Sequence, residues 1–173
     1  MKSDYRLRAK KFVQEIFPYL EKEKVFSSSD VFTYYRAVHC FNEDKKRRVV
    51  IGKGASRIAF ITSDYVVKMD YTDSDWAGTC ETELLAYRNV KGTRYEHLFA
   101  EISPFEYEGH AFYIMPRVKG IDHRRPDDFY WEVLSDEECC FLEENFLDLH
   151  GGNFGFHQGK FIIIDYAFNY FQE

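Results

Sequence analysis

The segment 148–165 constrains the fold more than any other part of the sequence, because it carries two acids and an amide on either side of one predicted strand. Asp148 is followed five residues later by Asn153, and Asp165 directly follows the apolar run 161–164. A short apolar run bounded by turn residues predicts a buried strand, here with a carboxylate at its end. Such side chains can supply a proton acceptor and hold Mg²⁺ around a polyphosphate. The pattern therefore suggests a phosphotransfer site.

The same residues also have a purely conformational explanation. Gly, Asn and Asp gather in turns whatever the function of a loop, so Asp148, Gly151, Gly152 and Asn153 can be turn formers and nothing more. This stretch alone does not decide between the two explanations, and the rest of the chain has to be considered.

Length and composition limit the class of protein. The 173 residues form one domain or two small lobes that share a cleft. A formal net charge of -6 argues against a nucleic-acid binder that relies on overall charge. No apolar run approaches the ~20 residues that span a bilayer, and no signal peptide is evident, so we expect a cytoplasmic protein. The cysteines lack CxxC spacing and predict neither disulfides nor a zinc site: Cys40, Cys80, Cys139 and Cys140.

The first 45 residues predict a helical extension. Residues 4–24 carry apolar side chains at helical spacing, and we expect Pro18 to kink or divide this helix. Asp30 follows a run of serines and is an N-cap signal for a second short helix that reaches about Cys40. A polar run then indicates a boundary near residue 45.

The pattern changes to strands after this boundary, and the first turn between strands is rich in glycine. The sequence from Ile51 to Arg57 is IGKGASR, in which two glycines one residue apart let the backbone lie close over phosphates. It is not a dinucleotide fingerprint, because no helix follows and Arg57 occupies the third glycine position. The predicted strands are 48–52, 57–62, 65–69, 98–107 and 110–118.

Lys68 lies inside the third predicted strand, between Val67 and Met69. Burying an ammonium group without an anion is costly, so a lysine here should meet one. The alternative is that Val67 and Met69 face the core while Lys68 extends along the other face toward solvent.

A helix predicted from Asp73 or Ser74 to about Val90 offers an anion. Glu83 lies on the apolar stripe of this helix, whereas Glu81 points about 160° away. We therefore expect Glu83 to pair with Lys68, and Glu81 is the second choice. Further along, Ser135 and Glu138 predict a capping box that starts a helix ending near Asn145.

The order of these features resembles the protein-kinase-like superfamily over about residues 48–167. The segment IGKGASRIAF resembles the glycine-rich loop, and YVVK, which ends at Lys68, resembles the strand of the phosphate-binding lysine. The segment DLHGGN from Asp148 to Asn153 resembles the catalytic loop of small-molecule and atypical kinases, and DYA at Asp165 is similar to the metal-binding DFG.

The resemblance implies an α+β, protein-kinase-like fold. Residues 46–118 would form an N-lobe with a five-stranded antiparallel sheet and one helix. Residues 119–173 would form a strongly truncated C-lobe with the catalytic loop and the metal-binding Asp165, and residues 1–45 would be a helical N-terminal extension.

The resemblance also implies ATP and Mg²⁺ as cofactors, with a role for each motif residue. Lys68 would neutralise the α- and β-phosphates, Glu83 would fix the lysine, and Asp148 would orient or deprotonate the acceptor hydroxyl. Asn153 and Asp165 would ligate Mg²⁺. The amides of residues 52–56 would cover the phosphates, and apolar side chains would enclose the adenine. The nucleotide-binding residues would be Ile51, Gly52, Lys53, Gly54, Ala55, Ser56, Ala59, Val66, Lys68, Met115, Arg117 and Val118.

The chain departs from the family pattern at several points. Phe146 replaces the histidine two residues before the catalytic Asp, so support for the loop must come from elsewhere, and His150 is either that support or an ordinary surface residue. Arg57 replaces the third glycine, and Ala167 replaces the glycine of DFG. Eight residues follow Asp165, so we expect no activation loop and no helical C-lobe to seat a peptide, as in minimal kinases of phages and bacterial effectors.

Three functions follow from the resemblance. The first is an ATP- and Mg²⁺-dependent phosphotransferase, a minimal Ser/Thr protein kinase in the cytoplasm of a bacterium or an infected host cell. The alternative is a pseudokinase that acts as a nucleotide-binding or protein-binding regulatory module. The third is a small-molecule kinase, which the short C-lobe disfavours. A protein substrate or host protein is the expected partner; the sequence gives no indication of nucleic acid, a membrane span or a particular oligomeric state.

Overall fold

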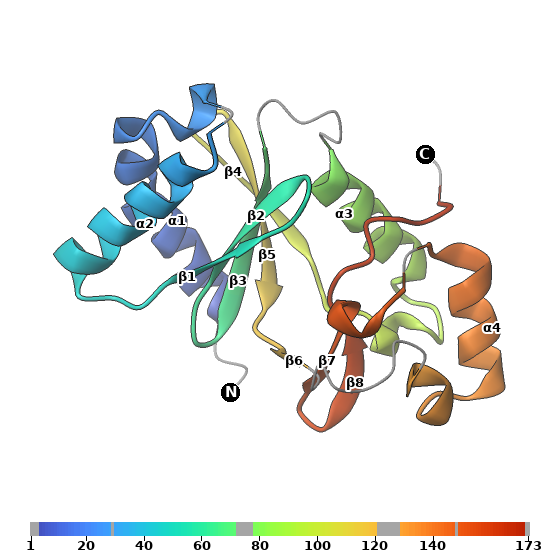
Figure 1. Ribbon diagram of the computed structural model, residues 1–173. Helices are drawn as coiled ribbons and strands as arrows, with labels where there is room; N and C mark the ends of the chain where they lie inside the picture. The colour runs from blue at the N-terminus through green and yellow to red at the C-terminus, as the bar shows by residue number, and fades with distance from the viewer. Residues whose placement is uncertain (1–3, 29, 72–77, 121–128, 148, 172–173) are drawn as a thin grey trace. The chain divides into compact units, whose positions relative to one another are not determined.

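A five-stranded antiparallel sheet is the centre of the first of two units into which the chain folds (Figure 1). The computed structural model describes residues 4–28, 30–71, 78–120, 129–147 and 149–171, and all structural statements below concern these residues. The first unit contains residues 1–80 and 103–117, and the second contains residues 81–102 and 118–173. The combination of helices with this sheet confirms the predicted α+β class.

The sheet of the first unit has the strand order β1-β2-β3-β5-β4. Glu108 and Gly109 connect β4 to β5 with φ angles of 49° and 74°, and two successive positive values are typical of the tight turn that joins antiparallel strands. The last two strands are shorter than predicted: Leu98 belongs to a 3₁₀ turn and β4 begins only at Ser103, and β5 ends at Pro116. The strands are β1 (Val50–Lys53), β2 (Arg57–Ile61), β3 (Tyr65–Asp70), β4 (Ser103–Tyr107) and β5 (His110–Pro116).

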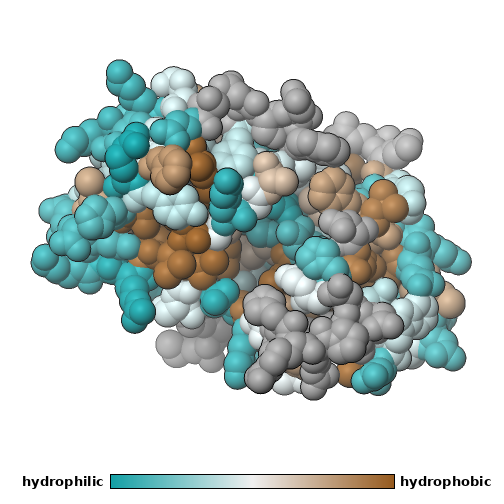
Figure 2. Space-filling model, viewed as in Figure 1, coloured by the Kyte–Doolittle hydropathy of each residue, from teal (hydrophilic) through white to brown (hydrophobic). Residues whose placement is uncertain are grey.

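Two helices cover one face of this sheet, α1 (Tyr5–Lys22) and α2 (Phe32–Lys45). α1 packs on β3, β4 and β5, and α2 packs on β1. Phe12 of α1 contacts Phe41 of α2 and Phe60 of β2 in edge-to-face geometry, with ring centroids 5.6 and 6.1 Å apart. Helices and sheet therefore share one hydrophobic core. The helical segment 1–45 that we expected to be an N-terminal extension is part of the first unit. Figure 2 shows hydrophilic side chains along the outer edge of this unit and an apolar patch nearer its middle.

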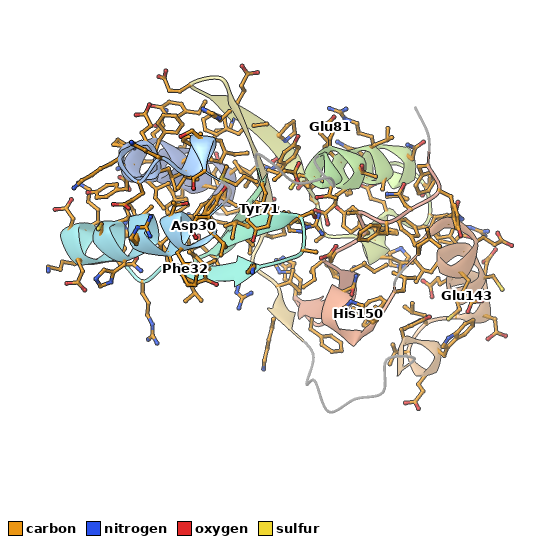
Figure 3. All side chains as sticks on the ribbon, turned by 45° about the horizontal axis from the view of Figure 1, so that its top comes forward. Asp30, Phe32, Tyr71, Glu81, Glu143 and His150 are labelled. Carbon is orange, nitrogen blue, oxygen red and sulfur yellow. The ribbon has the colours of Figure 1, made fainter. Side chains whose placement is uncertain are left out.

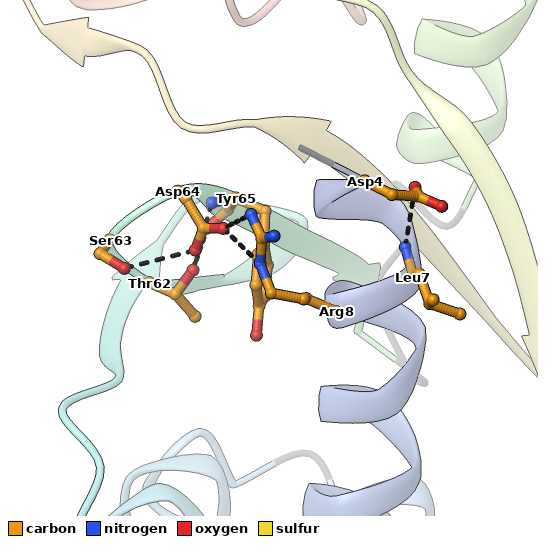
Figure 4. Close-up of polar contacts among 7 residues, drawn as sticks. All are labelled: Asp4, Leu7, Arg8, Thr62, Ser63, Asp64 and Tyr65. Atoms are coloured by element: carbon orange, nitrogen blue, oxygen red, sulfur yellow. Dashed lines mark hydrogen bonds and ion pairs between the residues drawn. The ribbon is translucent and has the colours of Figure 1, made fainter. Parts of the chain in front are cut away.

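Polar contacts at the ends of α1 complete this packing. Asp4 caps the helix by accepting a hydrogen bond from the amide of Leu7 (Figure 4). Arg8 donates from Nε to Asp64 in the turn between β2 and β3, over 2.8 Å. This ion pair is half-exposed and contributes at most about 1 kcal/mol, so the apolar contacts dominate. Pro18 lies inside α1 and does not divide it.

The second unit combines helices with a small three-stranded sheet. Ser135 and Glu138 form the predicted capping box at the start of α4, which ends at Asn145 as expected. The part of the predicted third helix before residue 78 lies outside the described residues. The elements are α3 (Thr79–Val90, in this unit from Glu81 on), β6 (Lys119–Gly120), α4 (Asp136–Asn145), β7 (Phe154–His157) and β8 (Lys160–Ile163), with 3₁₀ turns Glu96–Leu98, Phe129–Glu132 and Gly151–Asn153.

Two glycines face each other where β6 pairs with β7, and only one of them is enclosed. A Cβ atom at Gly155 would lie 2.5 Å from Val118 Cγ1 and 2.7 Å from the carbonyl oxygen of Lys119, whereas nothing lies within 4 Å of one at Gly120. We expect Gly155→Ala to lower the free energy of unfolding by about 1–3 kcal/mol through overpacking, measured from urea unfolding curves. Gly120→Ala is the control and should change it by less than about 0.5 kcal/mol. Equal effects of the two substitutions would contradict this account of the β6–β7 pairing.

Candidate functional site

The sheet face opposite α1 and α2 carries Lys68 and most of the predicted nucleotide-binding side chains of the sheet. Gly52 pairs with Ala59, and Ala59 pairs with Lys68. Val66 pairs with Met115 on the neighbouring row. Directly paired residues point to the same face of a sheet, so these five positions share one surface. Gly52 and Ala59 are the small residues of this surface. The space at Gly52 is tight, because a Cβ atom there would lie 3.1 Å from Ile61 Cδ1.

Ile51 does not belong to this surface. It pairs with Phe60, and its side chain packs against the core that the sheet shares with α1 and α2. The reason is the two-residue period of a strand, which turns alternate side chains to opposite faces. The expectation that Ile51 encloses the adenine together with Ala59 and Val66 is therefore corrected.

Two buried cations lie on this face. Lys68 is 7% exposed and Arg57 is 8% exposed. Arg57 starts β2, two residues before Ala59, and therefore shares the face of Lys68 on the adjacent strand. Buried cations are stable only where anions or dipoles compensate them, and both Lys68 and Arg57 have such interactions within the protein. The predicted ion pair of Lys68 and Glu83 joins residues of different units and stays a prediction.

The glycine-rich turn between β1 and β2 is held by hydrogen bonds from the segment that follows β3. Tyr71 donates its amide to the carbonyl of Ser56 over 2.9 Å, and its phenol to the carbonyl of Gly54 over 3.4 Å. Thr79 Oγ1 donates to Asp70 over 2.8 Å and lies 2.9 Å from Ser56 Oγ, which then acts as the donor to Thr79. The hydroxyl of Ser56 is thus used inside the unit, and the turn has a fixed backbone.

This fixed turn presents backbone amides. Gly54 donates its amide to the carbonyl of Arg57 over 2.9 Å. In the described part of the chain, the amides of Ala55 and Ser56 make no hydrogen bond. Adjacent amides in a turn can bind anions. Of the residues 52–56 predicted to bind phosphate, Ala55 and Ser56 therefore have amides suited to that role.

Tyr71 connects the turn to α2. Its ring packs edge-on against the ring of Tyr34, with centroids 5.8 Å apart. Burial raises the pKa of the Tyr71 phenol, and the nearby Tyr35 adds to the effect, so the phenol stays a hydrogen-bond donor at neutral pH. Sequence inspection missed Asp70, Tyr71 and Thr79. The acid at the end of a predicted strand was the available signal for Asp70, which also accepts from the amide of Cys80 at the start of α3.

The kinase resemblance implies that Met115 lies behind the adenine and that the backbone near Arg117 and Val118, just after β5, contacts it. Met115 is buried on the Lys68 face. The amide of Arg117 donates to the carbonyl of Asp64 over 3.0 Å. This amide is therefore already used within the first unit. Val118 is buried and belongs to the second unit.

In the second unit, Glu83 and Glu81 are oriented as predicted from helical geometry. Glu83 is fully buried, and its Oε1 accepts a hydrogen bond from the amide of Tyr166 over 3.2 Å. Glu81 is exposed on the outer side of α3 (Figure 3). The contact with Tyr166 brings Glu83 next to the residue that directly follows Asp165.

Asn153 and Asp165 also lie together in the second unit. Asn153 Nδ2 donates to the main-chain carbonyl of Asp165 over 3.0 Å, and the carbonyl of Asn153 accepts from the amide of Ile164 over 2.7 Å. The first bond fixes the orientation of the Asn153 amide. Its Oδ1 atom is buried and has no hydrogen-bond partner among the described residues. An unsatisfied buried acceptor costs about 1–3 kcal/mol, so this atom calls for a ligand.

Asp148 lies outside the described residues, but the loop around it is well defined on both sides. His150 is exposed, and its Nδ1 accepts from the amide of Gly152 over 3.1 Å (Figure 3). A Cβ atom at Gly152 would lie 2.9 Å from His150 Cε1, so this close contact requires glycine. His150 therefore supports the loop by capping the 3₁₀ turn that contains Asn153.

Phe146 supports the loop through apolar packing. It is buried, and its ring centroid lies 5.1 Å from that of Phe99 and 5.5 Å from that of Phe171. Tyr166 packs edge-on against Phe99 and donates its phenol to the carbonyl of Ala100 over 2.6 Å. Aromatic contacts thus take the place of the hydrogen bonds expected from a histidine at position 146.

Asn169 was missed by sequence inspection and connects the segment after Asp165 to α3. Its Nδ2 atom lies within 3.4 Å of the carbonyl oxygens of Thr82, Tyr166 and Ala167. Its Oδ1 accepts from the amide of Phe171 over 3.1 Å. A lone asparagine near a chain end gives no sequence signal for this role.

Comparisons with known proteins do not identify a family. No protein-family model matches the sequence, and no curated protein is significantly similar to it. In the described ranges, no group of three or more His, Cys, Asp or Glu side chains is arranged to hold a metal ion, and no helix is long and apolar enough to cross a membrane. The site must therefore be interpreted from its own geometry.

The hydroxyl chain behind the glycine-rich turn can be tested directly. Thr79→Val removes the link between Ser56 and Asp70, so we expect the free energy of unfolding to fall by roughly 1–3 kcal/mol. The amides of Gly54 and Tyr71 should exchange with solvent faster, because the turn opens more often. Thr79→Ser keeps the hydroxyl and is the matched control. Equal exchange rates in the two variants, measured by hydrogen exchange, would show that the hydroxyl does not hold the turn.

Proposed function

We propose that the protein is an ATP- and Mg²⁺-dependent phosphotransferase of the protein-kinase-like type, with a Ser or Thr hydroxyl of a protein as acceptor. The observation that carries the proposal is the buried Oδ1 of Asn153, which has no hydrogen-bond partner in the described part of the chain. It belongs to a residue that is bonded to the main chain of Asp165. Motif order suggested both residues as metal ligands, and their proximity within one unit supports that role.

The donor set suits Mg²⁺. An amide oxygen and a carboxylate are hard oxygen ligands, and Mg²⁺ in such sites typically keeps waters and substrate phosphates as further ligands. Asn153 and Asp165 would hold the ion, which would neutralise charge on the phosphates when bound. The hydrogen bond from Asn153 Nδ2 to the carbonyl of Asp165 fixes the side-chain amide. Its Oδ1 atom would therefore not have to reorient to bind the ion.

The sheet face with Lys68 suits the nucleotide. Lys68 supplies a positive charge for phosphate oxygens, and the amides of Ala55 and Ser56 supply donors in the turn. Ala59, Val66 and Met115 supply apolar surface for a base on the same face. The turn is held from behind by Tyr71 and Thr79, so little entropy is lost when a ligand binds it.

The remaining roles concern the acceptor and the lysine. Asp148 would orient or deprotonate the attacking hydroxyl, which requires only that a carboxylate lie within hydrogen-bond reach of it. Glu83 would fix Lys68. Its burial and its bond to the amide of Tyr166 give it one defined orientation.

Transfer of labelled phosphate from ATP to protein substrates tests this function. Lys68→Ala, Asp148→Ala and Asn153→Ala should each lower the rate by about 100-fold or more, because each removes a charge or ligand aimed at the transferred group. Glu81→Gln changes an exposed acid on the same helix as Glu83 and should leave the rate unchanged. Stabilisation of the wild-type protein by ATP with Mg²⁺, and its loss in Asn153→Ala, gives a second readout by thermal unfolding. Equal labelling in all variants would refute the assignment.

The packing of Phe146 favours a second candidate, a pseudokinase that binds nucleotide or protein without turnover. Apolar contacts can hold the loop in place without preparing it for proton transfer. This alternative predicts thermal stabilisation by ATP with no phosphate transfer, and the same biological activity in Asp148→Ala as in the wild type. Loss of biological activity in Asp148→Ala while partner binding persists would exclude it.

A further inference from the structure

The inference concerns a small apolar surface next to the loop that contains Asp148, within the second unit. Residues 145–147 and 168–170 form a two-stranded antiparallel contact centred on the pair Phe146 and Asn169. The amide of Leu147 donates to the carbonyl of Phe168 over 2.8 Å, and the amide of Tyr170 donates to the carbonyl of Asn145 over 2.9 Å. These bonds fix which side chains point inward and which point outward.

Phe146 and Asn169 point inward, where Phe146 packs against Phe99 and Asn169 binds main-chain carbonyls. By the two-residue period of a strand, their neighbours point outward. Leu147 is 45% exposed, Phe168 is 40% exposed and Tyr170 is 57% exposed. Three large side chains therefore form one outward strip, here called the 147–170 strip, and apolar colour is visible around this segment in Figure 2.

Acidic side chains border the strip. Glu143 and Glu144 are exposed in the last turn of α4, directly before Asn145, and Figure 3 shows Glu143 on this helix. Neither forms a salt bridge with any residue in the described ranges. The whole second unit has 16 Asp and Glu against 7 Lys and Arg, a formal charge of -9, whereas the first unit is formally +3. The electrostatic field around the strip thus attracts a basic partner.

We propose that the 147–170 strip binds an extended, basic polypeptide segment that inserts an apolar side chain between Leu147 and Phe168. Leu147 directly precedes Asp148 in the chain. A segment bound here is therefore delivered to the loop of the proposed acceptor-activating carboxylate. This inference rests on the proposed function for its biological meaning, and it names the acceptor class as a protein segment with Lys or Arg and an apolar residue beside its Ser or Thr.

Binding can be measured without nucleotide, by fluorescence anisotropy of a labelled peptide with four arginines, two leucines and one central serine among glycines. We expect Leu147→Ser and Phe168→Ser to weaken binding about tenfold or more, because each removes a large apolar contact. Glu143→Gln combined with Glu144→Gln should weaken binding several-fold and reduce its dependence on salt. These two glutamates are exposed, so the charge variant keeps the test valid if an apolar variant fails to fold.

Matched controls lie in the same unit. Phe156 is 39% exposed, about as much as Phe168, and Val133 is 47% exposed, about as much as Leu147. Both control residues lie outside the strip. Phe156→Ser and Val133→Ser should leave peptide affinity unchanged. A peptide with glutamates in place of the arginines, or serines in place of the leucines, should bind at least tenfold more weakly. Equal affinity of the serine peptide, or equal losses in the control variants, would overturn the proposal.

The outcome separates this inference from the proposed function. Peptide binding that depends on the strip, without phosphate transfer, would leave the docking surface in place and remove the kinase assignment. If phosphate transfer is equally fast with leucine-free peptides and in Phe168→Ser, the kinase assignment stands and the docking surface is overturned. A second copy of the chain is the other basic partner to consider, since its first unit is formally +3. Self-association that Phe168→Ser abolishes, measured by sedimentation in the absence of peptide, would assign the strip to dimerisation and overturn the peptide proposal.

Discussion

Burial of one face of the five-stranded sheet beneath α1 and α2 is the constraint on which the first unit depends. The helices take the apolar side chains of alternate strand positions, such as Phe60 and Val67, into a common core. The strand period then forces Ala59, Val66 and Lys68 onto the other face. A surface of small and apolar residues around a buried cation is thus a direct consequence of where the helices lie. The same helices reach the glycine-rich turn through the contact of Tyr34 with Tyr71.

In the second unit, the segments on either side of residue 148 are held by a different kind of contact. Aromatic packing of Phe146 and Tyr166 on Phe99 supplies most of the rigidity, and Asn169 adds main-chain contacts. This packing leaves the polar groups of Asn153 and Glu83 to bind the segment around Asp165. The two kinds of contact meet at Tyr166, whose ring packs on Phe99 and whose amide donates to Glu83.

Local sequence patterns predicted the elements and the orientation of several side chains, because those depend on neighbours within a few residues. The capping box of Ser135 and Glu138, the burial of Glu83 and the strand position of Lys68 are of this kind. Pattern reasoning failed where long-range packing decides. Residues 1–45 share a core with the sheet, Ile51 faces that core, and Tyr71, Thr79 and Asn169 act through partners distant in sequence. No local signal distinguishes Tyr71, Thr79 and Asn169 from ordinary turn and surface positions, whereas the strand period alone turns Ile51 away from the face of Gly52.

The two units differ in formal charge, and this difference bears on the proposed function. In the proposed function, a strongly anionic nucleotide would be favoured by the first unit, which is formally +3. A basic polypeptide is favoured by the second unit, which is formally -9. For the proposed phosphotransferase, the formal charges of the two units would thus favour different substrates before any specific contact forms. An acidic chain with a weakly basic unit is what such discrimination requires, and an even distribution of the same net charge would not provide it.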